Sequence, residues 1–305
     1  MLSMTSMLSM TAMTSILGSF LEMFEYEFMR RAIYAGLLAS VVFGIIGSYV
    51  VVKRIVFIAG GIAHASFGGV GLSFYLEWDR DTGPIIGAAL FALASALGIG
   101  VLNKETLERE ETTIGIVWAV GMALGALFIA MTPGYAISPS SYLFGNILFL
   151  KSLDLQLLSI LVGIVIISTI LLYHKLQATA FDEEFSTVVG IHTTVLHLYY
   201  LCLVALTIVL LIKFLGVILV LAMLTIPASL VGRFTHDLRW IMFFSSILSG
   251  IFIIGGLWTS FIWDTATGAT IVIESAIIYL VVVLFHQMRK RIRSLLSRSK
   301  VKQGI

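Results

Sequence analysis

The stretch VVKRIVFIAGGIAHASFGGVGLSF, residues 51–74, decides what kind of protein this chain can be. A basic pair, Lys53 and Arg54, precedes an uncharged run over residues 55–76. An α-helix needs about 20 apolar residues to cross a hydrocarbon core of ~30 Å, and this run has that length. His64 lies near the middle of the run. The stretch therefore predicts a membrane-spanning helix that carries one ionisable side chain at mid-depth.

The composition of the whole chain supports the same class of protein. Of its 305 residues, 59% are hydrophobic and 12% are charged, whereas soluble domains contain about 25% charged residues. This excludes a cytosolic enzyme and a disordered chain, and long uncharged runs favour helices over the alternating strands of a β-barrel. A net charge of +2 gives no argument for nucleic acid, and one cysteine, Cys202, excludes an internal disulfide.

Most of the other uncharged runs also fit one crossing each. They cover 32–52, 84–102, 112–150, 155–173, 198–212, 214–232, 240–263 and 265–285, the last interrupted only by Glu274. The predicted fold is an all-α integral membrane protein, a polytopic bundle of about 8–9 transmembrane helices. Because 112–150 is too long for one helix and contains Pro133 and Pro139, its final part, Ser140 to Leu150, is predicted to be a re-entrant half-helix.

The stretch 198–232 needs a break. As one helix it would be ~52 Å long at ~1.5 Å per residue, which exceeds the thickness of the membrane. Lys213 and Gly216 mark the predicted position of the break. Counting the two parts separately gives nine crossings, and counting them as one bent helix gives eight.

Basic residues predict the orientation, because they concentrate in cytoplasmic segments. With alternating crossings, Lys53, Arg54, Arg239 and the basic C-terminal tail fall on one side. We therefore expect a multi-pass protein of the cell (plasma) membrane with a cytoplasmic C-terminus and the N-terminus outside. The expected segments are an N-terminal interfacial segment (1–28), a transmembrane permease domain (29–287) and a basic cytoplasmic tail (288–305).

Motifs for catalysis are absent from the sequence. It contains no G-x-x-x-x-G-K-[ST] loop for ATP phosphates, no H-E-x-x-H zinc motif and no G-x-S-x-G nucleophile elbow. We therefore expect no catalytic residues in this chain, and activity within the membrane or through partner proteins.

Two ionisable residues are expected near the middle of the membrane. His64 and Glu274 each lie about ten residues into a predicted span, and the two spans enter from opposite sides. Such groups are costly in a membrane and mark functional sites, and imidazole and carboxylate together suit a first-row divalent metal. The alternatives are a neutral imidazole and a protonated carboxyl that hydrogen-bond within the bundle. The small residues around His64 allow close helix packing or local unwinding.

The longest connection on the predicted cytoplasmic side contains the acidic and aromatic segment Phe181-Asp182-Glu183-Glu184-Phe185. Such a segment on a membrane protein without a catalytic motif is a candidate docking element for another subunit. A solvated loop is the alternative reading.

These residues resemble a known family. The stretch 51–74 is similar to the signature of the zinc/manganese/iron family of ATP-binding-cassette importer permeases. Four further stretches match that family in the same order over residues 28–287. They are SYLFGNIL (141–148), FDEEFSTVVGI (181–191), LTIVLLIKFLGVILVLAMLTIPASLVGRF (206–234) and GLWTSFIWDTATGATIVI (256–273).

The resemblance also implies the partner subunits and the transported substrate. Such permeases form a homodimer, bind cytoplasmic ATPase subunits and receive metal from an extracytoplasmic metal-binding protein. A divalent metal ion would be the transported substrate, ATP would bind to the partner subunit, and no covalent cofactor is expected. The segment 181–191 matches the coupling segment of the family, which assigns ATPase coupling to Phe181, Asp182, Glu183, Glu184 and Phe185.

The chain departs from the family pattern at two positions. Gly60 stands where the family usually has an aspartate one helical turn before the histidine, and Asn146 stands where an aspartate is common. His64 is still expected to bind metal. Either Glu274 supplies the missing carboxylate, or the metal is held by fewer ligands, or the substrate differs. Three alternatives are a permease for a chelated metal or small organic cofactor, an ion-coupled secondary transporter, and a membrane scaffold without transport activity.

Overall fold

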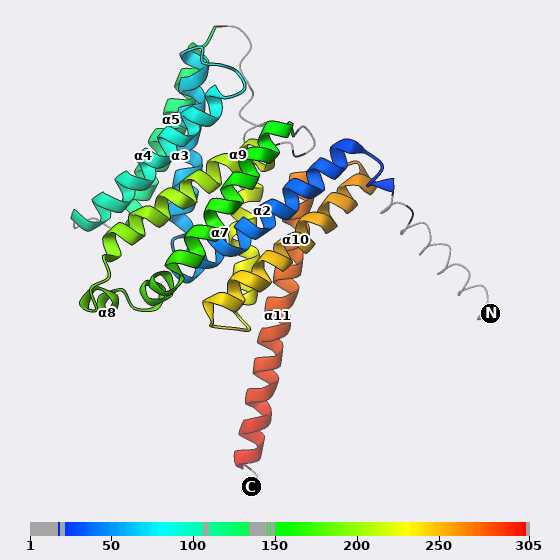
Figure 1. Ribbon diagram of the computed structural model, residues 1–305. Coiled ribbons are helices and arrows are strands. Elements are labelled where there is room, and N and C mark those ends of the chain that lie inside the picture. Colours follow the sequence, from blue (N-terminus) through cyan, green and yellow to red (C-terminus); the bar gives the residue numbers. More distant parts are fainter. Residues whose placement is uncertain are drawn as a thin grey trace, which may run out of the picture.

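The computed structural model describes residues 22–105, 110–133 and 150–302, together with Gly18, Gly145 and Ile147. All regular structure within these residues is helical (Figure 1). The helices are α2 (Glu27–Val52), α3 (Val56–Tyr75), α4 (Gly83–Glu105), α5 (Glu110–Met131), α7 (Ser152–Phe181), α8 (Glu183–Val188), α9 (Thr193–Val231), α10 (Leu238–Trp263) and α11 (Thr267–Lys302). Among the described residues, 8 helices are long and apolar enough to cross a membrane, which confirms the predicted fold class.

Helix α9 contains the predicted break. Gly216 has φ 77° and ψ 160°, which is not helical and which glycine adopts readily because it has no Cβ. The first arm begins beside α8, where the hydroxyls of Thr187 and Thr193 are 3.1 Å apart. It ends beside the start of α7, where Lys213 Nζ donates to Asp154 Oδ1 at 2.6 Å.

The second arm of α9 returns in the opposite direction. Phe214 and Leu219, on either side of the break, line a cavity together with Thr267 at the start of α11. The ring of Phe234, which follows the arm, lies 6.2 Å from that of His286. His286 is ~28 Å further along α11 than Thr267, at ~1.5 Å per residue. The chain thus crosses the bundle twice within one 39-residue element, which gives nine passes among the described residues.

The helices therefore begin and end at two opposite ends of the molecule. The α8 end carries Lys53, α8 itself, the α9–α10 connection and the C-terminus (Figure 1). The opposite end carries the α3–α4 and α10–α11 connections and the first turn of α7. This arrangement places Lys53, Arg54 and Arg239 together at one end, as the alternation of crossings predicted.

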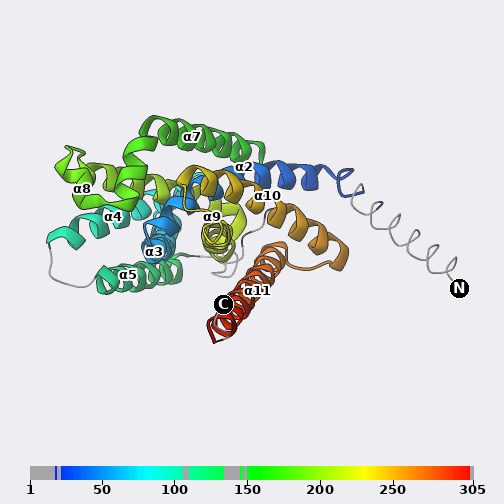
Figure 2. The same ribbon diagram turned by 90° about the horizontal axis from the view of Figure 1, so that it is seen from below.

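Packing divides the helices into two groups joined by α9. Helix α3 packs against α4 and α5, and α2 packs against α7 and α10, while α9 contacts both groups and α11. Figure 2 shows α5 and α11 along one side of the molecule and α7 on the other. Glycine permits these contacts, since a Cβ at Gly44 of α2 would overlap the backbone of Ser246 in α10.

Several predicted features lie outside the described residues. These are most of the N-terminal interfacial segment (1–28), the re-entrant half-helix apart from Gly145, Ile147 and Leu150, and Asn146. The C-terminal tail continues α11 as helix to Lys302.

Candidate functional site

His64 lies within the continuous helix α3, so no local unwinding exposes it. Its imidazole stacks on the indole of Trp118 from α5, with ring centroids 4.1 Å apart and planes 9° from parallel. The Nδ1 atom is buried and has no hydrogen-bond partner among the described residues. The alternative in which Nδ1 bonds to a neighbouring helix is therefore not what the structure shows. The ring is held by stacking, and a ring nitrogen remains for a ligand.

Small residues bring α5 close enough for this stacking. A Cβ at Gly61 would lie 2.8 Å from Ile114 Cγ2, and one at Gly68 would lie 2.9 Å from the carbonyl oxygen of Gly121. Such distances are below van der Waals contact, so the two helices approach along a line that only glycine permits. Close packing, rather than unwinding, is the observed role of the small residues in α3.

Gly60 faces the same indole as His64. A Cβ added there would meet Trp118 Cζ3 at 3.8 Å, which is ordinary contact, and no other heavy atom within 4 Å. The position one turn before His64 thus accepts a Cβ without a clash among the described residues. The carboxylate that the family pattern places there is absent from the sequence.

Glu274 lies in a different environment. Its Oε2 is 4.0 Å from the Cβ that Gly255 of α10 would carry, so the carboxylate lies in the contact between α10 and α11. Helices α3 and α11 are separated in both ribbon views and each packs on α9. One chain does not bring His64 and Glu274 together. The described residues contain no group of three or more His, Cys, Asp or Glu that is placed to hold a metal ion.

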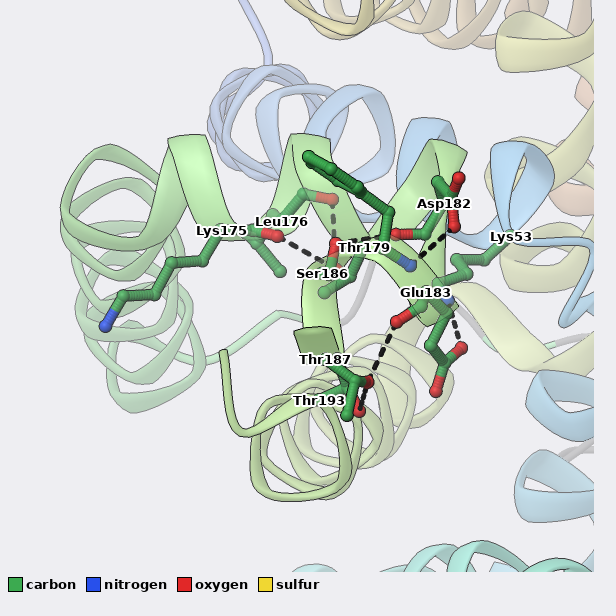
Figure 3. Close-up of polar contacts among 10 residues, drawn as sticks. Lys53, Lys175, Leu176, Thr179, Asp182, Glu183, Ser186, Thr187 and Thr193 are labelled. Carbon is green, nitrogen blue, oxygen red and sulfur yellow. Dashed lines mark hydrogen bonds and ion pairs between the residues drawn. The ribbon is translucent and has the colours of Figure 1, made fainter. Parts of the chain in front are cut away.

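The coupling segment forms a short helix at the α8 end (Figure 3). Asp182 caps α8 by accepting the Phe185 N–H at 2.9 Å, which a side-chain acceptor at the N-cap does for a helix start. Ser186 is buried against the bundle and donates to the Asp182 carbonyl at 2.6 Å. The aromatic rings point the other way, since Phe181 is 58% exposed and Phe185 63% exposed.

Glu183 ties this segment to the rest of the protein. Lys53 Nζ lies 2.7 Å from Glu183 Oε2, and the lysine side chain is only 13% exposed (Figure 3). Lys53 of the opening stretch therefore anchors α8, a role that the sequence did not indicate. Of the three acidic residues, Asp182 and Glu183 have intramolecular roles, and Glu184 is exposed.

Comparison with known proteins identifies the family of this arrangement. A model described as the ABC 3 transport family matches residues 25–286. The chain belongs to the ABC 3 transport family. This family member is 32% identical over 270 residues to the manganese transport system membrane protein MntC of Listeria monocytogenes, covering 87% of this chain and 94% of the relative. It is 38% identical over 244 residues to a probable metal transport system membrane protein of Chlamydia muridarum, covering 79% of this chain and 83% of the relative.

Solved structures give the same fold for this ABC 3 transport family member. PsaBC from Streptococcus pneumoniae, solved in complex with Fab, matches with a TM-score of 0.76 and 26% identity over 87% of this chain and 95% of that chain. An inward-facing putative metal-chelate type ABC transporter matches with a TM-score of 0.67 and 15% identity, which supports the fold alone.

Proposed function

We propose that this chain is the non-catalytic, membrane-spanning subunit of an ATP-driven importer for a divalent transition metal ion. Membership of the ABC 3 transport family and relatives named for manganese and metal transport support the proposal. The observation that carries it is the imidazole of His64, which is held by stacking at mid-span with Nδ1 unpaired. Neutral imidazole is a good ligand for zinc and iron(II), and a carboxylate beside it would suit manganese as well.

The second ligand comes from another copy of the chain in this proposal. A carboxylate in a membrane span faces protein or water rather than lipid, and Glu274 lies on α11. Figure 2 shows α5 and α11 along the same side of the molecule. A two-fold axis on that side places α5 of one copy beside α11 of the other. His64, next to α5, then lies near the path between the two copies, and the Glu274 carboxylate would have to turn from its contact with α10 to reach it.

The test of the metal path is uptake by the assembled transporter in proteoliposomes. His64→Ala should abolish uptake of manganese, zinc and iron(II), while the matched variant His286→Ala, at the α8 end, should transport normally. Glu274→Gln should reduce uptake severalfold, and adding Gly60→Asp should partly restore it, because Gly60 has room beside Trp118. Full metal-dependent uptake by His64→Ala would remove the site.

Two ATPase subunits bind to the α8 end in this proposal, and an extracytoplasmic metal-binding protein delivers the ion to the opposite end. The basic residues of the α8 end make it cytoplasmic by the positive-inside rule. An impermeant thiol reagent should not label cysteines placed at Glu183 or Arg298 from outside, in a Cys202-free background. Dependence of uptake on ATP distinguishes this importer from an ion-coupled secondary transporter.

The aromatic rings of the coupling segment are the proposed contact with the ATPase. Buried aromatic anchors usually dominate an interface, and rim charges contribute less. Phe181→Ala combined with Phe185→Ala should release the ATPase or uncouple hydrolysis from transport. Phe234→Ala is the matched control, since Phe234 is an exposed phenylalanine at the same end outside the segment. Normal ATPase association and stimulation in the double variant would contradict the assignment.

A further inference from the structure

A groove of about 420 Å³ lies between α2, α7 and α10, away from α5 and α11. Its walls are apolar over most of their area and include Val41, Ile170 and Ile247. Ile170 is 70% exposed, so the groove opens outward between membrane-spanning helices. One charged residue, Arg239, lies at its edge, in the first turn of α10.

Two buried hydroxyl groups line this groove. The Thr169 oxygen makes no hydrogen bond within the described part of the chain, and the Tyr173 oxygen is approached only by Arg239. Both residues line the groove from α7, one helical turn apart. A buried hydroxyl without a partner is destabilising, and threonine in a helix ordinarily donates to a carbonyl one turn earlier. These groups point to a ligand with hydrogen-bond acceptors.

Arg239 is placed to hold an anion at the same edge. Its guanidinium carbon lies 5.7 Å from the centre of the Tyr173 ring, and its side chain is 69% exposed. The nearby carboxylate of Asp237 approaches only Nε, at 3.6 Å, and accepts the Arg239 backbone N–H at 3.0 Å. The guanidinium therefore retains donors for a phosphate, which it binds well because of its planar fork.

The depth of these groups matches the layers of a bilayer leaflet. Trp240, beside Arg239, is exposed and stacks on Phe244, as aromatic residues do at the level of lipid head groups. From Arg239 to Ile247 the groove runs ~12 Å along α10 at ~1.5 Å per residue, which is less than the ~15 Å of one hydrocarbon leaflet. The order from the α8 end inward is a cation, two hydroxyls and an apolar channel.

We propose that this groove binds one anionic phospholipid from the leaflet at the α8 end. Arg239 holds the phosphate, the hydroxyls of Tyr173 and Thr169 donate to the carbonyl oxygens of the glycerol esters, and one acyl chain lies along Ile170 and Ile247. The charge of Arg239 favours a head group whose negative charge is not cancelled by an ammonium group. The site is separate from the proposed metal path, so it does not depend on the transported substrate.

The test is native mass spectrometry of the full-length chain in detergent, titrated with phosphatidylglycerol and, separately, phosphatidylcholine. Wild type should retain phosphatidylglycerol preferentially. Arg239→Gln should weaken that binding about fivefold, which corresponds to about 1 kcal/mol per basic residue at an anionic membrane surface. Thr169→Val, which keeps the shape and removes the hydroxyl, should weaken it by a smaller factor. Arg233→Gln is the matched control, since Arg233 makes the same kind of contact with Tyr279, at 5.6 Å, outside the groove.

Three outcomes would overturn the proposal. The first is equal retention of phosphatidylglycerol by wild type and Arg239→Gln, or an equal loss in Arg233→Gln. The second is displacement of the bound lipid by soluble glycerophosphate, which would reduce the site to a phosphate site without the acyl channel. The third is a disulfide between two copies of Ile170→Cys in a Cys202→Ser background, which would assign the groove to a second copy of the chain.

Discussion

Helices α3 and α11, which carry His64 and Glu274, are built in opposite ways. Of the most apolar window of each helix, 78% is buried inside the chain in α3 and 11% in α11. Yet α3 is the least hydropathic of the eight candidate spans. In a membrane, lipid is as apolar as leucine, so burial between helices requires small residues that pack closely rather than greater hydrophobicity. Hydropathy thus indicates that a helix spans the membrane, and the distribution of small residues indicates what it contacts.

The largest effect on stability should come from adding a side chain to α3, the closely packed helix of this pair. A Cβ at Gly69 of α3 would overlap the backbone carbonyl of Gly87 in α4, and backbone cannot move aside cheaply. We expect Gly69→Ala to destabilise the protein by about 3 kcal/mol, the upper part of the range for overpacking. Gly98→Ala in α4, with no atom within 4 Å of the new Cβ, is the matched control and should not lose stability. Thermal unfolding in detergent measures both, and similar melting temperatures would refute the packing argument.

A smaller effect should follow from loosening α9, which packs on both helices. Lys213→Met removes the partner of Asp154, whose side chain is 7% exposed. Because Lys213 itself is partly exposed, we expect a loss of about 2 kcal/mol, below the cost for a fully buried pair. The control is Lys151→Met, which breaks a pair with Asp81 whose side chains are 61% and 65% exposed; such exposed pairs contribute little, so this variant should lose much less stability. Equal losses in chemical denaturation would show that the Lys213 pair does not secure the turn.

Substitutions in the exposed helix α11 should change the stability of the chain least and the association between copies most. If α5 of one copy lies beside α11 of the next, cysteines at Val120 and Ile277 should form a disulfide between copies in a Cys202→Ser background. Both positions are more than half exposed and lie near the middle of their candidate membrane spans. Leu171→Cys on α7, paired with Ile277→Cys, is the control and should remain uncoupled. Non-reducing electrophoresis reports the result, and coupling only through Leu171 would move the interface to α7.

The sequence predicts what depends on length and local chemistry. The run around His64, the break at Gly216 and the opposite directions of α3 and α11 all follow from charge positions and run lengths, and the structure confirms them. The sequence did not predict which distant segments contact one another. Nothing in the sequence singles out Trp118 as the partner of His64, or joins Lys53 to Glu183 across 130 positions. A single sequence contains no signal for such pairs, because they depend on how helices pack.

The helical reversal at Gly216 also constrains how the protein enters the membrane. No polar loop separates the two arms of α9, and Lys213 is the only charge in 193–231. The second arm, 217–231, covers ~22 Å at ~1.5 Å per residue, which is short for a segment recognised alone by the insertion machinery. We therefore expect the short second arm to insert together with the first arm, as a hairpin. A mutation that makes the backbone at Gly216 helical would therefore disturb membrane insertion as well as the packing of the folded protein.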